Sequence, residues 1–163
     1  MIRKAERRDC LDLVTLSLQV WLHTYATKGV RPLISQYALS TFTESHFVEL
    51  LNQKSTDVLV FEQDSHLVGF IVVDLDSRFE GCSHSGYEVT TLYVSQHFQG
   101  AGIGRKLLKN VEGLYGPPLW LSTWEENHNA LAFYKRLGFQ LVGKRNFDLE
   151  GELHSNHVLV YNS

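Results

Sequence analysis

The sequence contains little cysteine and no long apolar segment. Its 163 residues include two cysteines, Cys10 and Cys82, which form neither a CxxC pair nor a disulfide framework. We therefore expect a reducing, cytoplasmic location. No apolar run approaches membrane-spanning length, and residues 1–8 lack the apolar core of a secretory signal. These features argue against a membrane partner and against a disulfide-stabilised secreted protein.

Excess positive charge is also missing. The formal net charge is −3, which argues against a dedicated nucleic-acid binder. The eight histidines are scattered without the spacing of a zinc site, so no metal is expected. An apolar content of 44% and a charged content of 20% are those of an ordinary soluble globular protein. We expect one domain over residues 1–163.

Apolar periodicity and turn residues predict a mixed α/β chain. Pro32 is interpreted as an interruption after the first helix. The residues at 57–61 and 67–75 form a hairpin, and a helix crossover joins strands that can lie parallel. The predicted strands are 2–5, 57–61, 67–75, 87–94, 119–124, 139–148 and 157–161, and the predicted helices are 9–23, 43–51, one from the glycine stretch to 114, and one from 127 to 138.

The stretch "YVSQHFQGAGIGRKLLKN", residues 93–110, leads from a strand through three glycines into a helix. The free amides and the dipole of a helix N-terminus favour an anion, and glycines let a phosphate approach the backbone. Close packing of the helix on the sheet explains the glycines equally well. A P-loop would need Lys after Gly104, where Arg105 stands, and the GxGxG spacing differs from a dinucleotide fingerprint.

The pattern Gln99-x-x-Gly102-x-Gly104 after "LYV" resembles the acetyl-CoA loop of the GNAT superfamily, the GCN5-related N-acetyltransferases. The segment "LWLSTWEENHNALAFYKRLGF", residues 119–139, resembles a later segment of the same family. Together with "VWLHTY", part of it is similar to the spermine/spermidine-type, PaiA-like branch. The resemblance covers essentially the whole chain. It implies a mostly antiparallel central sheet, flanked by helices and splayed at the acetyl-CoA site.

The resemblance implies acetyl-CoA as cosubstrate and assigns residues to it. The pyrophosphate would lie on the glycine-loop amides, and the pantetheine arm would pair with the preceding strand like an added strand. An asparagine would contact the cofactor, although local hydrogen bonding at the start of a helix is the alternative. The assigned residues are Leu92, Val94, Gln99, Gly100, Gly102, Gly104, Arg105 and Asn129.

Two residues are candidates for the chemistry. Tyr134 matches the family tyrosine that protonates the departing CoA thiolate, although its helical spacing also fits an ordinary core residue. Glu88 is the first candidate base for the amine. It alternates with Thr90 and Leu92 on one face of the strand, unless a bulge reverses this pattern. A solvated strand-edge carboxylate is the alternative for Glu88. Weaker candidate bases are His84, Glu125 and Glu126.

The acceptor amine is expected to meet the first helices and the loop after them. Aromatic rings at Trp21 and Tyr25, near His23, can hold a cation, although helical core is the simpler role for Trp21. Four acids, which equally fit a solvated loop, can attract a cationic amine: Asp74, Asp76, Glu80 and Glu88.

These features together predict an N-acetyltransferase that moves an acetyl group from acetyl-CoA to a primary amine by direct attack. The acceptor is a polyamine or another small amine. The alternatives are acetylation of a protein or peptide N-terminus, or a non-catalytic acyl-CoA-binding module. The last two strands, including residues 156–160, offer an edge for a homodimer or simply close the sheet.

Overall fold

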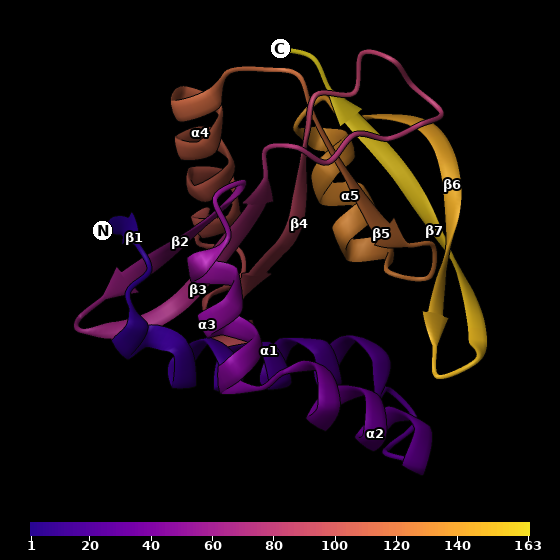
Figure 1. The fold of residues 1–163 in the computed structure, drawn as a ribbon. Helices are drawn as coiled ribbons and strands as arrows, with labels where there is room; N and C mark the ends of the chain where they lie inside the picture. The colour runs from indigo at the N-terminus through magenta and orange to yellow at the C-terminus, as the bar shows by residue number, and fades with distance from the viewer.

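The computed structural model describes residues 1–163 and contains one seven-stranded sheet with helices on both faces (Figure 1). The strands are β1 (Ile2–Lys4), β2 (Thr56–Gln63), β3 (His66–Asp74), β4 (Tyr87–Val94), β5 (Leu119–Trp124), β6 (Gln140–Leu149) and β7 (Glu152–Tyr161). The helices are α1 (Cys10–Tyr25), α2 (Pro32–Thr41), α3 (Glu44–Asn52), α4 (Ile103–Tyr115) and α5 (His128–Arg136). The predicted mixed α/β class is confirmed.

The sheet has the order β1-β2-β3-β4-β5-β7-β6. Every neighbouring pair is antiparallel except β4 and β5, which are parallel and joined by helix α4. Only two residue pairs connect them, Tyr87 with Leu119 and Glu88 with Trp120. The two strands diverge beyond these pairs, and we call the resulting gap the fork. The predicted splayed, mostly antiparallel sheet is therefore confirmed.

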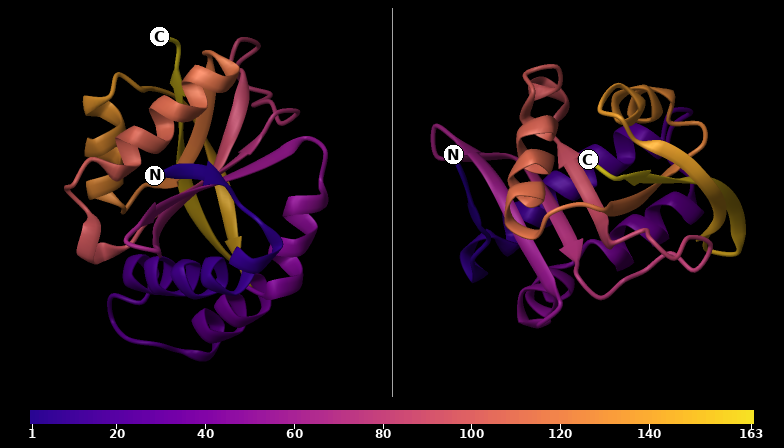
Figure 2. Two further views of the ribbon diagram at one scale, coloured as in Figure 1. Left: turned by 90° about the vertical axis from the view of Figure 1, so that its left-hand side faces the viewer. Right: turned by 90° about the horizontal axis from the view of Figure 1, so that it is seen from above.

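The helices divide between the two faces of the sheet. Helices α4 and α5 cover one face, and α1, α2 and α3 cover the other (Figure 2). Under α4 and α5 lies the largest core cluster, which includes Ile71, Leu107 and Leu121. Under α1 and α3 lies a second cluster that includes Leu13 and Phe70. The fork consequently separates two well-packed parts of the sheet, and each face supplies side chains to it.

Helix α2 was not predicted, and this omission is the main error in the expected order. Pro32 does not interrupt the chain but occupies the first turn of α2. Proline suits that position because its missing N–H would have no helical partner there and its φ angle already fits a helix. Helix α2 buries Ile34 and Ala38 against Trp21 and Leu149.

Of the two alternatives for residues 156–160, closing the sheet fits the structure. These residues belong to β7, which pairs with β5 on one side and with β6 on the other. Of the last two strands, it is β6 that forms an edge of the sheet, and most of its side chains are exposed. None of the helices combines the length and the apolar character needed to cross a membrane.

Candidate active site

The fork leaves part of the β4 backbone without a strand partner. The Ser95 N–H donates to the Val68 carbonyl of β3 at 2.8 Å. Backbone N–H and C=O groups alternate in direction along a strand. Those of Tyr93 therefore also face β3, whereas those of Leu92 and Val94 point into the fork. The side chains of Leu92 and Val94 pack against the core under α4 and α5. Their amides are therefore held rigidly at an open edge.

A β-bulge interrupts β4 between its two halves. Val73 of β3 pairs with Val89 and Val72 pairs with Thr91, so Thr90 is the extra residue. The bulge shifts the alternation of side chains by one residue. Glu88 therefore lies on the α1 side of the sheet while Leu92 lies on the α4 side. The expectation that Glu88, Thr90 and Leu92 share one face is wrong, and the bulge named as its exception is present.

The glycine loop, residues 99–104, presents bare backbone at the start of α4. Gly100 and Gly102 have positive φ angles of 84° and 79°, which favour glycine. A Cβ atom added at either position would meet no atom within 4 Å, so neither glycine is required by packing. The first helical bond runs from the Lys106 N–H to the Gly102 carbonyl, which leaves the amides of residues 102–105 free. This arrangement suits an anion.

Gly104 differs from the other two glycines. A Cβ atom there would lie 3.2 Å from Cζ of Phe133, on α5. Gly104 thus permits close contact between α4 and α5 across the fork. Both interpretations of the glycine cluster are therefore represented: open backbone at Gly100 and Gly102, and close packing at Gly104. Arg105 follows with an exposed side chain beside the loop.

Gln99 connects the glycine loop to the open edge of β4. Its side-chain Nε2 donates to the Val94 carbonyl at 3.2 Å. That carbonyl faces the fork, so the Gln99 amide occupies an acceptor that an added strand would otherwise use. The Val94 N–H remains available beside it.

Tyr134 lies on α5 with its ring buried between Phe133 and Phe139, at centroid distances of 5.2 and 5.3 Å. Burial raises the pKa of its phenol above the ordinary value of 10.0. The hydroxyl makes no hydrogen bond within the protein, yet it is not among the enclosed polar atoms that lack a partner. Tyr134 therefore has a ring that packs in the core and a hydroxyl that has no hydrogen-bond partner in the protein.

No sequence motif points to Tyr93. It lies opposite Phe70 of β3, and the two rings are 5.6 Å apart between centroids, on the face covered by α1 and α3. Burial raises the pKa of the Tyr93 phenol, and the phenols of Tyr25, Tyr37 and Tyr134 raise the pKa further. These four tyrosines come from β4, α1, α2 and α5, so only the tertiary fold relates them.

Glu88 lies at the closed end of the fork, next to Trp120 in the neighbouring strand. It is only 8% exposed. One carboxylate oxygen accepts a hydrogen bond from the Ser77 hydroxyl at 2.7 Å, and the other faces Arg145 at 3.4 Å. The Arg145 guanidinium also lies 5.2 Å from the Trp120 ring centroid. Glu88 is therefore a buried, paired carboxylate rather than a solvated one.

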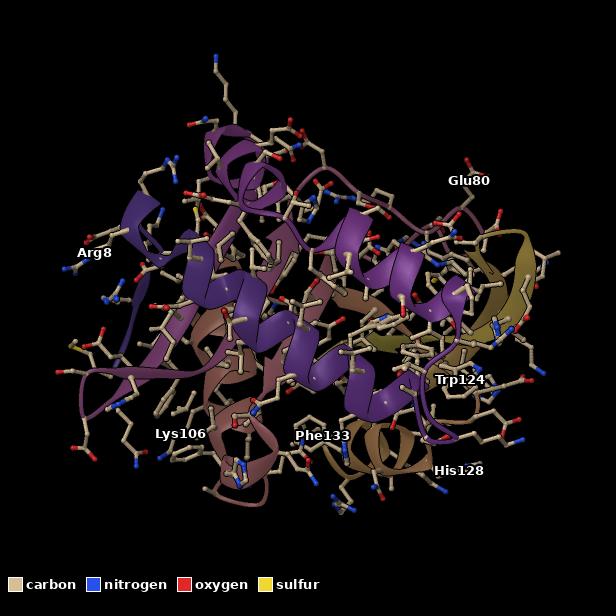
Figure 3. All side chains as sticks on the ribbon, turned by 90° about the horizontal axis from the view of Figure 1, so that it is seen from below. Arg8, Glu80, Lys106, Trp124, His128 and Phe133 are labelled. Atoms are coloured by element: carbon tan, nitrogen blue, oxygen red, sulfur yellow. The ribbon has the colours of Figure 1, made fainter.

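The weaker candidate bases lie elsewhere. His84 and Glu126 are exposed. Glu125 has a carboxylate oxygen 3.9 Å from both Lys144 and His157, on the α5 side of the sheet. Glu80, in the loop before β4, points outward into solvent (Figure 3).

The asparagines at the start of α5 have different surroundings. Asn127 is the N-cap, and its side-chain oxygen accepts a hydrogen bond from the Ala130 N–H at 3.3 Å. Asn129 is exposed in the first turn and makes no side-chain hydrogen bond. Local hydrogen bonding therefore belongs to Asn127, and Asn129 is free to meet a ligand.

Aromatic residues line the α1 and α2 side of the fork. Tyr25 of α1 stacks on Trp124, the last residue of β5, at a centroid distance of 4.9 Å. Figure 3 shows Trp124 beside the C-terminal end of α1 and close to α5. We call the aromatic group at this place the aromatic wall; its members are Trp21, Tyr25, Tyr37, Trp124 and Phe147. Trp21 is 3% exposed and is a core member, as expected.

Comparison with known protein families identifies the family of this chain. The profile described as the acetyltransferase (GNAT) family matches residues 19–139, which is more than half of the chain. This chain belongs to the GNAT acetyltransferase family. The predicted enzyme class, an acetyl-CoA-dependent N-acetyltransferase, is confirmed by this membership.

Individual GNAT relatives are distant. An uncharacterized N-acetyltransferase from the pepI 3' region of Lactobacillus delbrueckii subsp. lactis is 21% identical over 97% of this chain and 94% of the relative. A probable spermine N(1)-acetyltransferase of Bacillus subtilis subsp. natto is 33% identical over 56% of this chain and 63% of the relative. The latter match thus spans less than two thirds of that protein.

Among solved GNAT structures, the PaiA N-acetyltransferase of Thermoplasma acidophilum in complex with coenzyme A superposes with a TM-score of 0.79. The match covers 100% of this chain and 98% of that one at 20% identity. It confirms the fold.

Proposed function

We propose that residues 1–163 act as one domain that transfers the acetyl group of acetyl-CoA to a primary amine, with a polyamine or a similar small cationic amine as acceptor. The observation that carries this proposal is the fork. It places an open backbone edge and a helix N-terminus on one side of a gap, an aromatic wall on the other, and a buried carboxylate at the closed end.

The β4 side of the fork suits acetyl-CoA. The Leu92 and Val94 amides can pair with the pantetheine arm as an added strand would. The pyrophosphate fits the free amides beyond Gly100 and Gly102, with the Arg105 charge beside it. Gln99, Gly104 and Asn129 complete the set assigned by family resemblance. Solved relatives with coenzyme A support acetyl-CoA as the cosubstrate.

Tyr134 is the proposed donor to the leaving thiolate. Its phenol stays protonated at neutral pH because burial raises its pKa. A higher pKa also makes complete proton transfer harder, so the first effect is a hydrogen bond to sulfur as the C–S bond breaks. The hydroxyl has no protein partner to compete for that bond.

Glu88 is the proposed base. An alkylamine with a pKa near 10 is mostly protonated at neutral pH and must lose a proton before it attacks the thioester carbon. Each Glu88 oxygen has one observed partner, and a carboxylate offers about four acceptor sites in total. Glu88 therefore has the capacity to take the proton, directly or through one water.

The aromatic wall supports a cationic acceptor. Stacked rings such as Tyr25 and Trp124 attract a cation through their π faces. The relative named as a probable spermine N(1)-acetyltransferase agrees with this class. The free cysteines Cys10 and Cys82 fit the cytoplasm, where polyamines and acetyl-CoA would both be available.

The test is thiol release from acetyl-CoA across spermidine, spermine, short diamines, an aminoglycoside and peptides with free N-termini. Turnover with the polyamines and diamines is expected. Turnover with peptides alone would replace this acceptor class by an N-terminal acetyltransferase. Tight CoA binding without thiol release from any acceptor would overturn the proposed activity in favour of a binding module.

A further inference from the structure

Asn156, on β7, has a buried side chain that no protein group satisfies. The residue is 9% exposed, and its Oδ1 is enclosed without a hydrogen-bond donor. A carboxamide offers two donors and two acceptor sites, and none of these meets a protein partner here. Buried polar groups in proteins are normally paired, so an orphaned carboxamide calls for an explanation. Ser17 Oγ and Tyr87 OH are the other enclosed orphans.

The position of Asn156 is more informative than its burial. In register it lies directly opposite Trp124 of β5 and Arg145 of β6. Residues that are directly opposite in neighbouring strands project from the same face of a sheet. Asn156 therefore lies on the face covered by α1 and α2, between the aromatic wall and the ion pair of Arg145 with Glu88.

Asn156 differs from the two neighbouring carboxylates in having no protein partner at its side-chain oxygen. The Glu88 carboxylate is already paired with Arg145, and Glu152 is held by Arg31 at 3.0 Å and by His154 at 2.8 Å. The pairing of Glu152 with Arg31 and His154 lowers its pKa. Both neighbouring carboxylates thus have cationic or imidazole partners, whereas the Asn156 carbonyl has none.

The Asn156 carboxamide can present its oxygen to a ligand with little movement. Its Nδ2 is not among the enclosed orphan atoms, so one atom of the group reaches the surface. A half-turn about the terminal torsion exchanges nitrogen and oxygen without altering the shape of the side chain. The oxygen would then take the more accessible position that the nitrogen now has.

We propose that Asn156 is a specificity-determining residue for the acceptor: its Oδ1 accepts an N–H from the reacting primary alkylamine while the tail of the amine lies on the aromatic wall. This inference rests on the proposed function and names one further residue that recognises the acceptor. The hydrogen bond holds the amine beside the aromatic wall, and it satisfies a carbonyl that otherwise has no partner.

The test compares wild type with Asn156→Leu, which keeps the shape of the side chain but removes both polar atoms, using spermidine as the probe amine. The KM for spermidine is expected to rise about 10-fold, as for loss of one hydrogen bond to a charged group. The KM for acetyl-CoA should stay within about two-fold, and the melting temperature should hold or rise because a buried orphan is removed.

Asn156→Asp keeps only acceptor oxygens and is expected to leave the spermidine KM unchanged or lower it. Tyr87→Phe is the matched control, because it removes another enclosed orphan on the opposite face of the sheet. It should preserve both KM values. A spermidine KM in Asn156→Leu within about two-fold of wild type would overturn the inference. A parallel loss of stability and of acetyl-CoA affinity would do so as well.

If the wild type turns over no amine, the proposed function fails first, and calorimetric binding of spermidine decides the inference separately. Binding by wild type but not by Asn156→Leu would uphold an amine site at Asn156. Equal binding by the two proteins, or none by either, would refute it.

Discussion

The two sides of the fork offer a ligand different kinds of groups. The β4 side offers backbone amides, those of Leu92 and Val94 and those at the start of α4. The opposite side offers side chains, among them Trp124 and Asn156. Backbone groups persist through most substitutions, whereas side-chain groups change with each one. Cofactor recognition should therefore tolerate sequence change, and acceptor choice should depend on a few residues.

The largest expected effect tests the backbone side. Gly102→Glu places bulk and a negative charge where the pyrophosphate is expected, and like charges in contact cost several kcal/mol. The Kd for acetyl-CoA should rise by at least about 10³-fold, or about 4 kcal/mol. The open space around Gly102 should let the variant fold, at a cost of about 1 kcal/mol for its left-handed backbone.

Gly113→Glu is the control for that variant, since it adds the same charge at an open position of the same helix. Calorimetry with acetyl-CoA and thermal melting would be measured on both. Unchanged affinity in a folded Gly102→Glu protein would remove the glycine loop from the cofactor site.

Glu88→Gln tests the side chain at the closed end of the fork and should have the next largest effect. It retains the shape and an acceptor for Ser77 but removes the basic carboxylate. The kcat/KM for the amine should fall on the order of 10³-fold, with acetyl-CoA affinity preserved. Glu62→Gln is matched to it, because Glu62 is also paired with an arginine, Arg3, at 2.7 Å. Equal losses in both variants would assign Glu88 a structural role.

Tyr134→Phe tests the phenol hydroxyl that α5 supplies. The kcat should fall on the order of 10²-fold while the KM for acetyl-CoA is unchanged. Tyr161→Phe is a close control, since Tyr161 packs against the same Phe139 at the same centroid distance of 5.3 Å. Its kcat should match that of wild type.

The pH dependence gives a second readout for Tyr134. The protonated phenol is the active form, and burial raises its pKa, so the donor should persist up to and beyond pH 10. The wild-type kcat should therefore show no alkaline loss below about pH 10. An alkaline decline centred near pH 8, absent from Tyr134→Phe, would contradict the raised pKa.

Trp124→Leu should have the smallest effect and the most selective one. Loss of a cation–π contact of about 1–2 kcal/mol should raise the KM of a diamine about 5- to 30-fold. A monoamine with an uncharged tail should lose much less, because it has no second cation to place on the aromatic wall. Equal losses for the two acceptors would show that Trp124 shapes the fork without recognising charge.

Most of the fold could be predicted because its signals are local. The β4 segment and the glycine-led start of α4 follow from composition and turn chemistry over a few residues each. Helix α2 was not predicted because proline has two opposite effects on a helix. It breaks a helix in the interior, but it is favoured in the first turn, where Pro32 lies. Only the structure on either side of a proline shows which of these two effects applies.

The residues of the candidate site also fall into two groups, those that a local sequence pattern locates and those that depend on the tertiary structure. Residues proposed to act through the backbone, such as Gly102 and Val94, lie in one short stretch that family resemblance locates. The face on which Tyr93 lies depends on the bulge at Thr90, and the place of Asn156 depends on the register of β7 with β5. A one-residue shift reverses the face of every following side chain, so no local pattern could place them.

The short contact between β4 and β5 also has a consequence for amide hydrogen exchange. Amides in the middle of a sheet normally exchange their hydrogens slowly, since a neighbouring strand holds them. Leu92 and Val94 belong to a central strand, yet their amides face no strand partner. They should exchange as quickly as amides of an outer strand until a ligand covers them. Their deuterium uptake would then report, residue by residue, how fully the enzyme is loaded.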